Sequence, residues 1–446
     1  MSSTLTEKEI LEQVVKDNVK FVNMQFIDLF GVVKNITITV EHLEDAFKNG
    51  VWFDGSSIEG FAKIHESDMF LKPDPTTYAL IPWLNSPEGN TARFICDIFC
   101  PDGRPFEGDP RNILKKVLKE AEELGYTYNT GPEFEFFLFK KDNDKLVPLP
   151  HDTGGYFDLS MDKAYEVRRE MAVVLRKFGI DVERLSHEVS AGQHEINFCY
   201  GSALQTADNA TTLRCVLKAV AERHGLHATF MPKPIAGING SAMHVHQSLF
   251  KNGENVFFDA SDSHCLSPIA KNFIAGQLKH IQGMCAITSP TVNSYKRLAP
   301  GYEAPVYVSW AKTNRSALIR VPAFKKEKPK AARIELRCPD PTCNIYLAFA
   351  VMLKAGLDGI KNNLQPPESI EDDLYGFDES KLSKFNVTQL PYSLFDAVKY
   401  MKKSDLVRDV FGEATYSKYV SAKIAEWDEF RLQVTQWELD RYLELY

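Results

Sequence analysis

Residues 131–139 read Gly-Pro-Glu-Phe-Glu-Phe-Phe-Leu-Phe, a strand-like stretch on which the prediction of the fold turns. Side chains at i and i+2 on a strand point to the same face, so Glu133 and Glu135 project together and the residues between them face an apolar side. Phe137 and Phe139 follow on the carboxylate face and should be buried there. A solvated sheet face is the alternative, but carboxylates beside buried rings are costly unless a cation pairs with them. We therefore predict a core strand with one packing face and one functional face.

Two further segments carry potential ligands at the ends of predicted strands. Glu188 and Glu195 flank a turn at Ala191-Gly192, so both could reach one ion, although this signal is weak by itself. In residues 237–248, two histidines and a serine share a face after an Asn-Gly turn. A lone histidine is usually a core residue, but this pair at i and i+2 favours a site. The residues of that segment are Asn239, Gly240, His244, His246 and Ser248.

A fourth segment, residues 332–337, places Arg333, Glu335 and Arg337 on one face of a predicted strand. An ion-pair ladder with a structural role is the alternative for this segment taken alone. This segment indicates a functional site only in combination with the three segments above, which supply further carboxylates and histidines.

Together the four segments offer mostly oxygen ligands with one nitrogen, a set that favours Mg²⁺ or Mn²⁺ over zinc or copper. Six ligand groups suffice for two ions, and clustered carboxylates need cations to offset their repulsion. Arginines at positions 297, 315 and 320 suit carboxylate and phosphate groups. Two metals with arginines nearby predict phosphoryl transfer. The six groups are Glu133, Glu135, Glu188, Glu195, His244 and Glu335.

The sequence contains neither of the common nucleotide-binding glycine motifs. The nearest candidate for a phosphate-binding loop, Gly55-Ser-Ser-Ile-Glu-Gly60, is followed by Phe61-Ala62 where that motif has lysine and serine or threonine. Nucleotide binding is therefore expected to rest on metals and arginines.

Composition predicts a globular, cytoplasmic protein. Of the 446 residues 44% are hydrophobic and 25% are charged, which is typical of a globular protein. The net charge of -8 does not favour binding to nucleic acid or to an anionic membrane. The longest apolar run, Ile345 to Leu353, is far shorter than a membrane span, and the N-terminus does not resemble a signal peptide. The eight cysteines are scattered without zinc-site spacing, so buried, reduced thiols are expected.

A cluster of turn residues between positions 100 and 110 predicts a boundary between a small domain, 1–103, and a large domain, 104–446. A helix from Pro110 to about Gly125 should follow it. Strands at 19–28 and 32–40 indicate a mixed α/β domain before the boundary, and helices at 161–178 and 206–224 alternate with strands after it. The overall class is α+β.

The segment 416–446 is predicted to be helical and exposes more aromatic residues than an isolated terminal helix should. It packs either on its own domain or on another subunit. The aromatic residues are Trp427, Phe430, Trp437 and Tyr442.

These motifs resemble the signature regions of type I glutamine synthetases. The resemblance rests on residues 132–137, 239–246, 293–305 and 333–337 and extends from Phe26 to the C-terminus. It implies a small β-grasp-like N-terminal domain and a catalytic domain whose curved antiparallel sheet is flanked by helices. It also implies ATP-dependent ligation of ammonia to glutamate through γ-glutamyl phosphate, with two or more Mg²⁺ or Mn²⁺ ions, in nitrogen assimilation.

The resemblance also implies roles for individual residues. One metal would be held by Glu135, Glu188 and Glu195, and another by Glu133, His244 and Glu335. Glutamate would be bound by Asn239, Gly240, Arg297, Glu303, Arg315 and Arg337, and ATP by His246, Ser248, Arg315, Arg320, Lys330 and Arg333. The catalytic residues would be Asp28, which takes a proton from ammonium across a subunit boundary, the flap residue Glu303, and Arg315.

Members of the family form two stacked six-membered rings, so a dodecamer with active sites between subunits is implied. The adenylylated tyrosine motif of β-type members is replaced here by residues 373–378, so adenylylation is not expected. The chain resembles the α-type, which is feedback-inhibited by glutamine. Lys63 stands where many α-type enzymes have an arginine linked to that inhibition, and lysine lacks arginine's planar fork, so weaker inhibition is expected.

Two other functions are compatible with parts of this pattern. A γ-glutamyl-amine ligase acting on a polyamine would keep the metals and arginines, but Asp28 and Glu303 argue for an ammonium pocket. A catalytically inactive scaffold should have lost metal ligands, whereas all six positions are filled.

Overall fold

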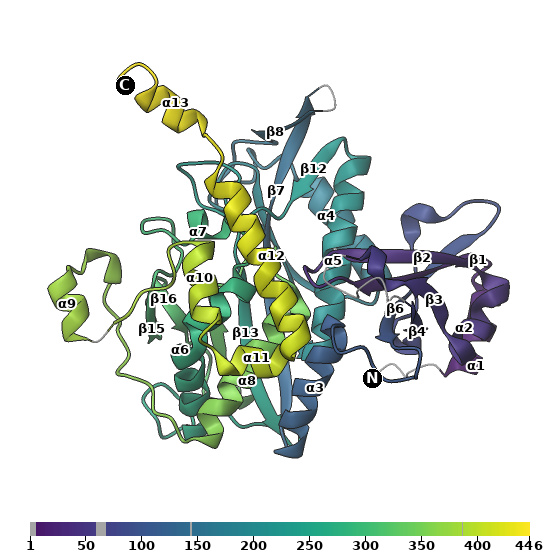
Figure 1. Ribbon diagram of the computed structural model, residues 1–446, viewed down its shortest axis with the longest axis horizontal. Helices are drawn as coiled ribbons and strands as arrows, with labels where there is room; N and C mark the ends of the chain where they lie inside the picture. Colours follow the sequence, from purple (N-terminus) through teal and green to yellow (C-terminus); the bar gives the residue numbers. More distant parts are fainter. Residues whose placement is uncertain (1–5, 59–67, 143–144, 386) are drawn as a thin grey trace.

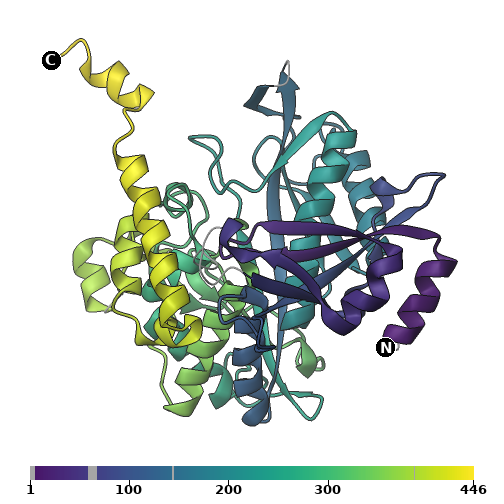
Figure 2. The same ribbon diagram turned by 45° about the vertical axis from the view of Figure 1, so that its right-hand side comes forward.

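The computed structural model describes residues 6–58, 68–142, 145–385 and 387–446. It has an α+β fold with two sheets, each with its own buried cluster, and the smaller sheet lies beside the larger body (Figures 1 and 2). Lys63, the residue predicted to affect glutamine inhibition, lies outside the described residues. Of the helices in the described ranges, none is long and apolar enough to cross a membrane.

The N-terminal domain is a mixed sheet in the order β2-β1-β6-β4-β3, in which the central pair β1 and β6 is parallel. The strands expected at 19–28 and 32–40 are confirmed within a residue at each end. The elements are α1 (Glu7–Lys16), β1 (Val19–Ile27), β2 (Val33–Thr39), α2 (Leu43–Asn49), β3 (Val51–Asp54), β4 (Asp68–Pro73), β5 (Ala79–Leu80) and β6 (Asn90–Phe99).

The C-terminal domain is built on a curved sheet ordered β15-β16-β17-β13-β7-β10-β9, with β7 near its middle. Its pairs are antiparallel except for β15 and β16 at one edge, which run parallel and depart from the expected all-antiparallel sheet. The strands are β7 (Thr127–Asp142), β8 (Lys145–Pro150), β9 (Val182–His187), β10 (Gln193–Phe198), β11 (Gly201–Ser202), β12 (Leu226–Thr229), β13 (Met243–Lys251), β14 (Glu254–Asn255), β15 (Tyr307–Ala311), β16 (Ala317–Arg320) and β17 (Ile334–Leu336).

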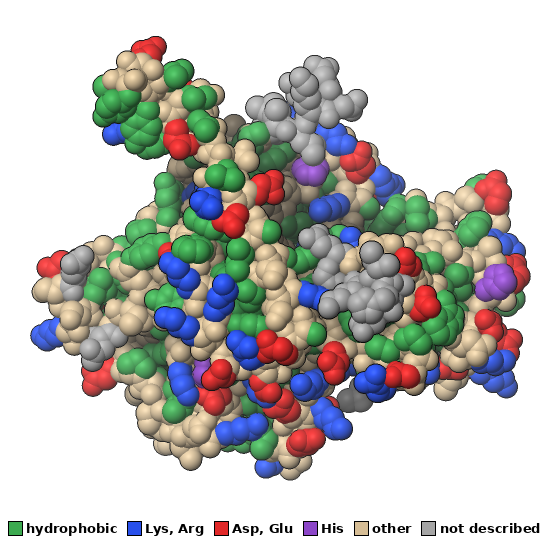
Figure 3. All heavy atoms as spheres, viewed as in Figure 1, with side chains coloured by type: hydrophobic (Ala, Val, Ile, Leu, Met, Phe, Trp, Pro, Cys, Tyr) green, Lys and Arg blue, Asp and Glu red, His purple; other side chains and the backbone are tan. Residues whose placement is uncertain are grey.

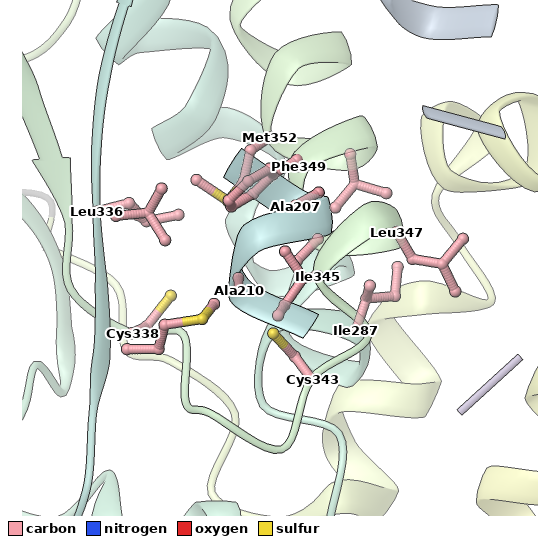
Figure 4. Close-up of a cluster of buried hydrophobic side chains, with 14 of the residues drawn as sticks. Ala207, Ala210, Ile287, Leu336, Cys338, Cys343, Ile345, Leu347, Phe349 and Met352 are labelled. Atoms are coloured by element: carbon pink, nitrogen blue, oxygen red, sulfur yellow. The ribbon is translucent and has the colours of Figure 1, made fainter. Parts of the chain in front are cut away.

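One face of this sheet packs on helices, as residues 131–139 predicted. Phe134 and Phe136 are fully buried in the main core, and Figure 4 shows a part of that core with side chains from β17, α5 and α8. The helices are α3 (Pro110–Glu123), α4 (Tyr165–Lys177), α5 (Ala203–Arg223), α6 (Pro268–Thr288), α7 (Ser294–Arg297), α8 (Ile345–Lys361), α9 (Glu379–Lys384), α10 (Leu394–Met401), α11 (Asp405–Phe411), α12 (Glu413–Arg431) and α13 (Gln436–Tyr442).

The predicted helix boundaries hold where capping residues mark them. Asp109 accepts a hydrogen bond from the N–H of Arg111 at the start of α3, and Gly125 follows its end with φ of +81°. The helix expected at 161–178 begins later, at Tyr165, because the carboxylate of Asp162 accepts from the N–H of Ala164 and holds the preceding residues in a turn.

The C-terminal segment is interrupted, contrary to the expectation of continuous helix over 416–446. Thr435 and Glu438 form a capping box that starts α13 anew after α12 ends at Arg431. The side chain of Trp427 packs against the main core, whereas that of Trp437 is 61% exposed. Helix α13 projects from the body and carries hydrophobic side chains on its surface (Figure 3).

The eight cysteines, all within the described ranges, carry thiols as expected, and five of them are buried. Cys199 is exposed, which corrects the expectation that all would be buried. It lies just beyond β10, where the chain leaves the sheet.

Arg111, on α3, joins the N-terminal sheet to helix α5 through three aspartates. Its guanidinium lies 2.7 Å from a carboxylate oxygen of Asp74 and of Asp97 in the N-terminal domain and 2.9 Å from one of Asp208 on α5. The side chain is 2% exposed. Burial opposes its charge, but the three carboxylates outweigh that cost and raise the pKa of Arg111.

We expect Arg111→Met to lower the free energy of unfolding by about 3–5 kcal/mol, because it leaves partly buried carboxylates without their shared cation. The thermal midpoint measures the effect. Arg104→Met is the matched control, since Arg104 pairs with Asp102 on the surface and exposed pairs contribute little. Equal midpoints for the two variants would contradict the structural role of Arg111.

Candidate active site

Two adjoining cavities open on the polar face of the catalytic sheet, and Glu133 lines both. The first has a volume of about 290 Å³ and the second about 560 Å³. The predicted residues that line the first are Glu133, Glu135, Glu188, Glu195, Asn239, Gly240, His244, Arg297, Glu303, Arg315, Arg320 and Arg337. Those that line the second are Glu133, His246, Ser248, Lys330 and Arg333. The structure thus brings together residues separated by two hundred positions in the chain.

A cluster of Glu133, His244 and Glu335 forms where three strands meet. His244 on β13 pairs in register with Glu133 on β7, and its Nδ1 lies 3.4 Å from Glu133 and 3.5 Å from Glu335. Burial and the nearby Arg337 lower the pKa of His244 to about 4, so its imidazole is neutral near pH 7. A neutral imidazole between two carboxylates is a suitable ligand set for a divalent ion.

Glu335 is fully buried between two arginines. Arg320 Nε donates to one carboxylate oxygen at 2.5 Å and Arg337 Nη1 to the other at 2.6 Å. Burial alone would raise the pKa of Glu335, but Arg337, the histidines and Arg320 outweigh it and lower the pKa. The predicted alternation of Arg333, Glu335 and Arg337 thus becomes a charged strand that faces both cavities.

A second carboxylate cluster, Glu135, Glu188 and Glu195, has neutral hydrogen-bond partners. Glu135 accepts from the side chain of Gln193 at 3.1 Å and from the N–H of Ala242 at 2.9 Å. Burial and then the neighbouring carboxylates raise the pKa of Glu135, and the same causes raise the pKa of Glu195 to about 8. Burial also raises the pKa of Glu188.

The cluster of Glu133, His244 and Glu335 has ligand atoms within 4.8 Å of one another and fits a divalent metal ion by its spacing. Glu135, Glu188 and Glu195 line the first cavity, where burial and neighbouring carboxylates outweigh the charges of Arg184 and Arg297, so a bound cation or protons would lower their electrostatic cost. The oxygen-rich set suits a hard ion such as Mg²⁺ or Mn²⁺. The first cluster is already balanced by arginines, so a cation there would change the contacts of Glu335 with them.

Residues 239–240 line the first cavity, shortly after a turn at residues 236–237. A Cβ atom on Gly240 would lie 2.1 Å from the carbonyl oxygen of Pro232, so only glycine fits. Arg297, which is 2% exposed, donates to the carbonyl oxygens of Arg337 and Cys338, both at 2.8 Å. These bonds hold the turn after β17 beside the cavity.

Glu303 lies in a loop that lines the first cavity. Its φ is +54°, a conformation that few residues other than glycine adopt, and it follows Gly301 at φ of +88°. Tyr375 anchors this loop through a hydrogen bond from its hydroxyl to the carbonyl oxygen of Ala304.

The second cavity has a basic wall. Arg333 Nε donates to Nδ1 of His246 at 3.3 Å, and Nε2 of that ring donates to Glu133 at 2.8 Å. The two bonds fix the tautomer of His246 and orient Arg333 toward the cavity. Lys330 and Ser248 complete a lining that can hold phosphate groups.

Asp28 is not among the residues that line either cavity. Its Oδ1 accepts hydrogen bonds from the N–H groups of Phe30 at 3.0 Å and Val32 at 2.8 Å, and Lys34 Nζ lies 3.3 Å from Oδ2. Within one chain this buried carboxylate stabilises the turn between β1 and β2. Its role toward ammonium stays a prediction.

Sequence reasoning missed several residues that line the first cavity. Gln193 could have been found, because it lies at i−2 from Glu195 on one strand face. Tyr156 and Tyr302 come from loops, where the sequence offers no periodic signal.

Behind β9 and β10 lies a buried group of Asp152, His187 and His194 that resembles a metal site by spacing. Arg168 donates to Nδ1 of His194 at 2.8 Å, which leaves the hydrogen of that ring on Nε2. His187 donates to Asp152 at 2.9 Å and to the carbonyl oxygen of Glu188 at 2.6 Å. Nε2 of His194 is buried without a hydrogen-bond partner, while the other three ring nitrogens bind protein groups. The bonds of His187 support the end of β9, immediately before Glu188.

Comparisons with known proteins agree with this geometry. The family profile of the glutamine synthetase catalytic domain matches residues 107–442, and that of the glutamine synthetase β-grasp domain matches residues 18–101. Glutamine synthetases of Clostridium saccharobutylicum and Thermotoga maritima are 51% and 50% identical, each over 443 residues that cover 99% of both chains. The solved structure of Plasmodium falciparum glutamine synthetase matches with a TM-score of 0.88 at 26% identity, covering 98% of this chain and 99% of that chain.

Proposed function

Because this chain belongs to the glutamine synthetase family and is a glutamate–ammonia ligase, we propose that its first cavity holds glutamate with divalent metal ions and its second holds ATP. The enzyme makes glutamine from glutamate and ammonia with the energy of ATP. The relatives at about half identity do not favour the alternative of a polyamine ligase.

The observation that carries this assignment is the group of carboxylates at the first cavity, of which Glu133 also lines the second. Glu135, Glu188 and Glu195 would hold one Mg²⁺ or Mn²⁺ ion, and Glu133, His244 and Glu335 another. When bound, such ions would neutralise phosphate charge during phosphoryl transfer.

Arginines supply the remaining positive charge. Arg320, Arg333 and Lys330 would attend the phosphates of ATP with His246 and Ser248, while Arg315 and Arg337 would face the reacting carboxylate. Their charge would stabilise the transition state as the γ-carboxylate attacks the terminal phosphorus, the bond from that phosphorus to the β–γ bridging oxygen breaks, and γ-glutamyl phosphate and ADP form. Arg297, Asn239 and Gly240 would hold the amino-acid end of glutamate.

The ammonia step needs a base and a closed loop. Glu303 would cover the acyl phosphate and exclude water until ammonia attacks its carbonyl carbon and releases phosphate. A carboxylate must take a proton from ammonium, and Asp28 remains the proposed group. In that case it would act in the site of a neighbouring subunit.

We extend the proposal to a dodecamer of two stacked rings in the cytoplasm that is inhibited by glutamine. The support for assembly is the projecting α13, since Trp437 on this helix and Leu443 immediately after it are exposed at 61% and 72%. Exposed apolar side chains grouped in this way are typical of a surface that contacts a partner. The thiols of all eight cysteines fit a reducing compartment.

The test is phosphate release from ATP by purified protein with glutamate and Mg²⁺, with ammonium or a panel of amines. We expect release that depends on ammonium and equals the glutamine formed. Release with another amine alone would keep the metal site but overturn the substrate. Absence of release from metal-loaded, assembled protein would favour an inactive scaffold.

A further inference from the structure

Lys233 is a buried cation that the proposed mechanism does not use. It belongs to the segment of residues 233–240, called here the glutamate turn, which ends at the proposed glutamate-binding residues 239–240. Its side chain leaves 9% of its surface exposed, and its ammonium donates a hydrogen bond to the carbonyl oxygen of Ile238. The backbone N–H of Lys233 donates to Asn293 Oδ1 at 2.7 Å, and Asn293 Nδ2 donates back to the carbonyl oxygen of Lys233 at 3.1 Å. Lys233 is therefore fixed at both its backbone and its tip.

A second contact of this ammonium is with an aromatic ring in the loop of residues 299–305, which lines the first cavity. Nζ of Lys233 lies 3.4 Å from the ring centroid of Tyr302, a close cation–π contact in a largely buried setting. Tyr302 lies between Gly301 and Glu303, both at positive φ, and lines the first cavity. Residues 300–303 are assigned as turn, and residues 299–305 lie outside every helix and strand of the described chain, so side-chain contacts add to the hold on this loop.

From these contacts we propose that Lys233 and Tyr302 form a latch that ties the covering loop, residues 299–305, to the glutamate turn, residues 233–240. Lys233 is a positioning residue, because it does not line the cavity and acts through Tyr302 and Ile238. This inference rests on the proposed function, since it assumes that glutamate binds at residues 239–240. The latch couples occupation of that turn to closure of the loop.

The latch has a chemical consequence at the acyl phosphate. Water that reaches this intermediate returns glutamate and phosphate, so the net reaction becomes hydrolysis of ATP to ADP and phosphate without glutamine. Closure of the loop suppresses this loss by excluding water. The ratio of phosphate released to glutamine formed therefore reports the latch directly.

The experiment compares Lys233→Met, which keeps the apolar stem, with Tyr302→Leu and Tyr302→Phe in otherwise complete protein. A buried cation–π contact shifts an equilibrium by about 2- to 30-fold. We expect Lys233→Met and Tyr302→Leu to raise the phosphate-to-glutamine ratio and the KM for glutamate within that range. Tyr302→Phe keeps the ring and should restore the ratio of the parent enzyme.

Lys381→Met is the matched control, because Lys381 Nζ lies 3.7 Å from the ring centroid of Phe377 outside both cavities. The double variant Lys233→Met/Tyr302→Leu should add little to either single change if the two residues act as one contact. A ratio of one in both single variants would overturn the latch while leaving glutamine synthesis intact. A parent enzyme that forms no glutamine would instead overturn the proposed function.

Discussion

Replacing Glu335 by alanine is expected to reduce glutamine formation on the order of a thousandfold, because one change removes a ligand of the proposed metal site and frees two arginines. Glu335 is fully buried, and Arg320 and Arg337 both donate to it. Loss of their shared anion leaves two guanidiniums without a counter-charge. We also expect the free energy of unfolding to fall by about 3–5 kcal/mol.

Glu335→Gln separates the two effects, since it keeps the volume of the side chain and removes only its charge. Metal binding, measured by calorimetric titration with Mn²⁺, should weaken in both variants, whereas the thermal midpoint should fall more for alanine. Glu254→Gln, at an exposed position on β14, is the control. Parent-like turnover in Glu335→Ala would refute the assignment of Glu335 as a ligand.

The apparent affinity for divalent metal is expected to rise steeply with pH up to about 8. The pKa of Glu195 is raised to about 8 by burial and by Glu133 and Glu188, and the pKa of Glu135 is raised by the same kinds of cause. An ion must displace the protons that these carboxyls hold. Each displaced proton changes the apparent dissociation constant by about tenfold per pH unit below the pKa.

The metal-free protein should respond to pH in the opposite sense. The folded state keeps a proton on Glu195 up to about pH 8, whereas an unfolded glutamate releases it near the ordinary value of 4.5. The contribution of Glu195 to the free energy of unfolding is therefore fully present below about pH 4.5. It is lost as the pH rises through 8, by up to about 1.4 kcal/mol per pH unit.

The rise of metal affinity with pH and the fall of metal-free stability with pH can be tested on the same protein. Thermal midpoints of protein treated with a chelator should fall between pH 6 and 9, and Glu195→Gln, which has no carboxyl proton to lose, should flatten that slope. Titration with Mn²⁺ in buffers of different ionisation enthalpy should reveal released protons. A midpoint independent of pH in the parent protein would show that Glu195 titrates normally.

The local pattern of the site could be predicted from sequence because strand alternation is a local property. Glu133 and Glu135 face the cavity, and Phe134 and Phe136 enter the core, as residues 131–139 indicate. The burial of Phe137 beside the carboxylates is also confirmed. Helix α3 was predictable for the same reason, since its caps lie within its own sequence.

Register and loop geometry could not be predicted. The pairing of His244 with Glu133, and of His246 with Glu335, depends on how distant strands align, which a single sequence does not encode locally. The contact between Lys233 and Tyr302 joins two irregular segments without periodic patterns. The break before α13 was missed because helical propensity outweighed the Thr435 capping signal in the prediction.

Gln193 connects the carboxylates of the first cavity with the segment proposed to receive glutamate. Its amide nitrogen donates to Glu135 at 3.1 Å and to the carbonyl oxygen of Gly240 at 3.0 Å. An amide NH2 group carries two hydrogens, so it makes both bonds at once and can transmit a change at Glu135 to residue 240. If a cation at Glu135 changes the affinity for glutamate, thermodynamic reciprocity requires glutamate to change the affinity for the cation by the same factor, whichever ligand is added first.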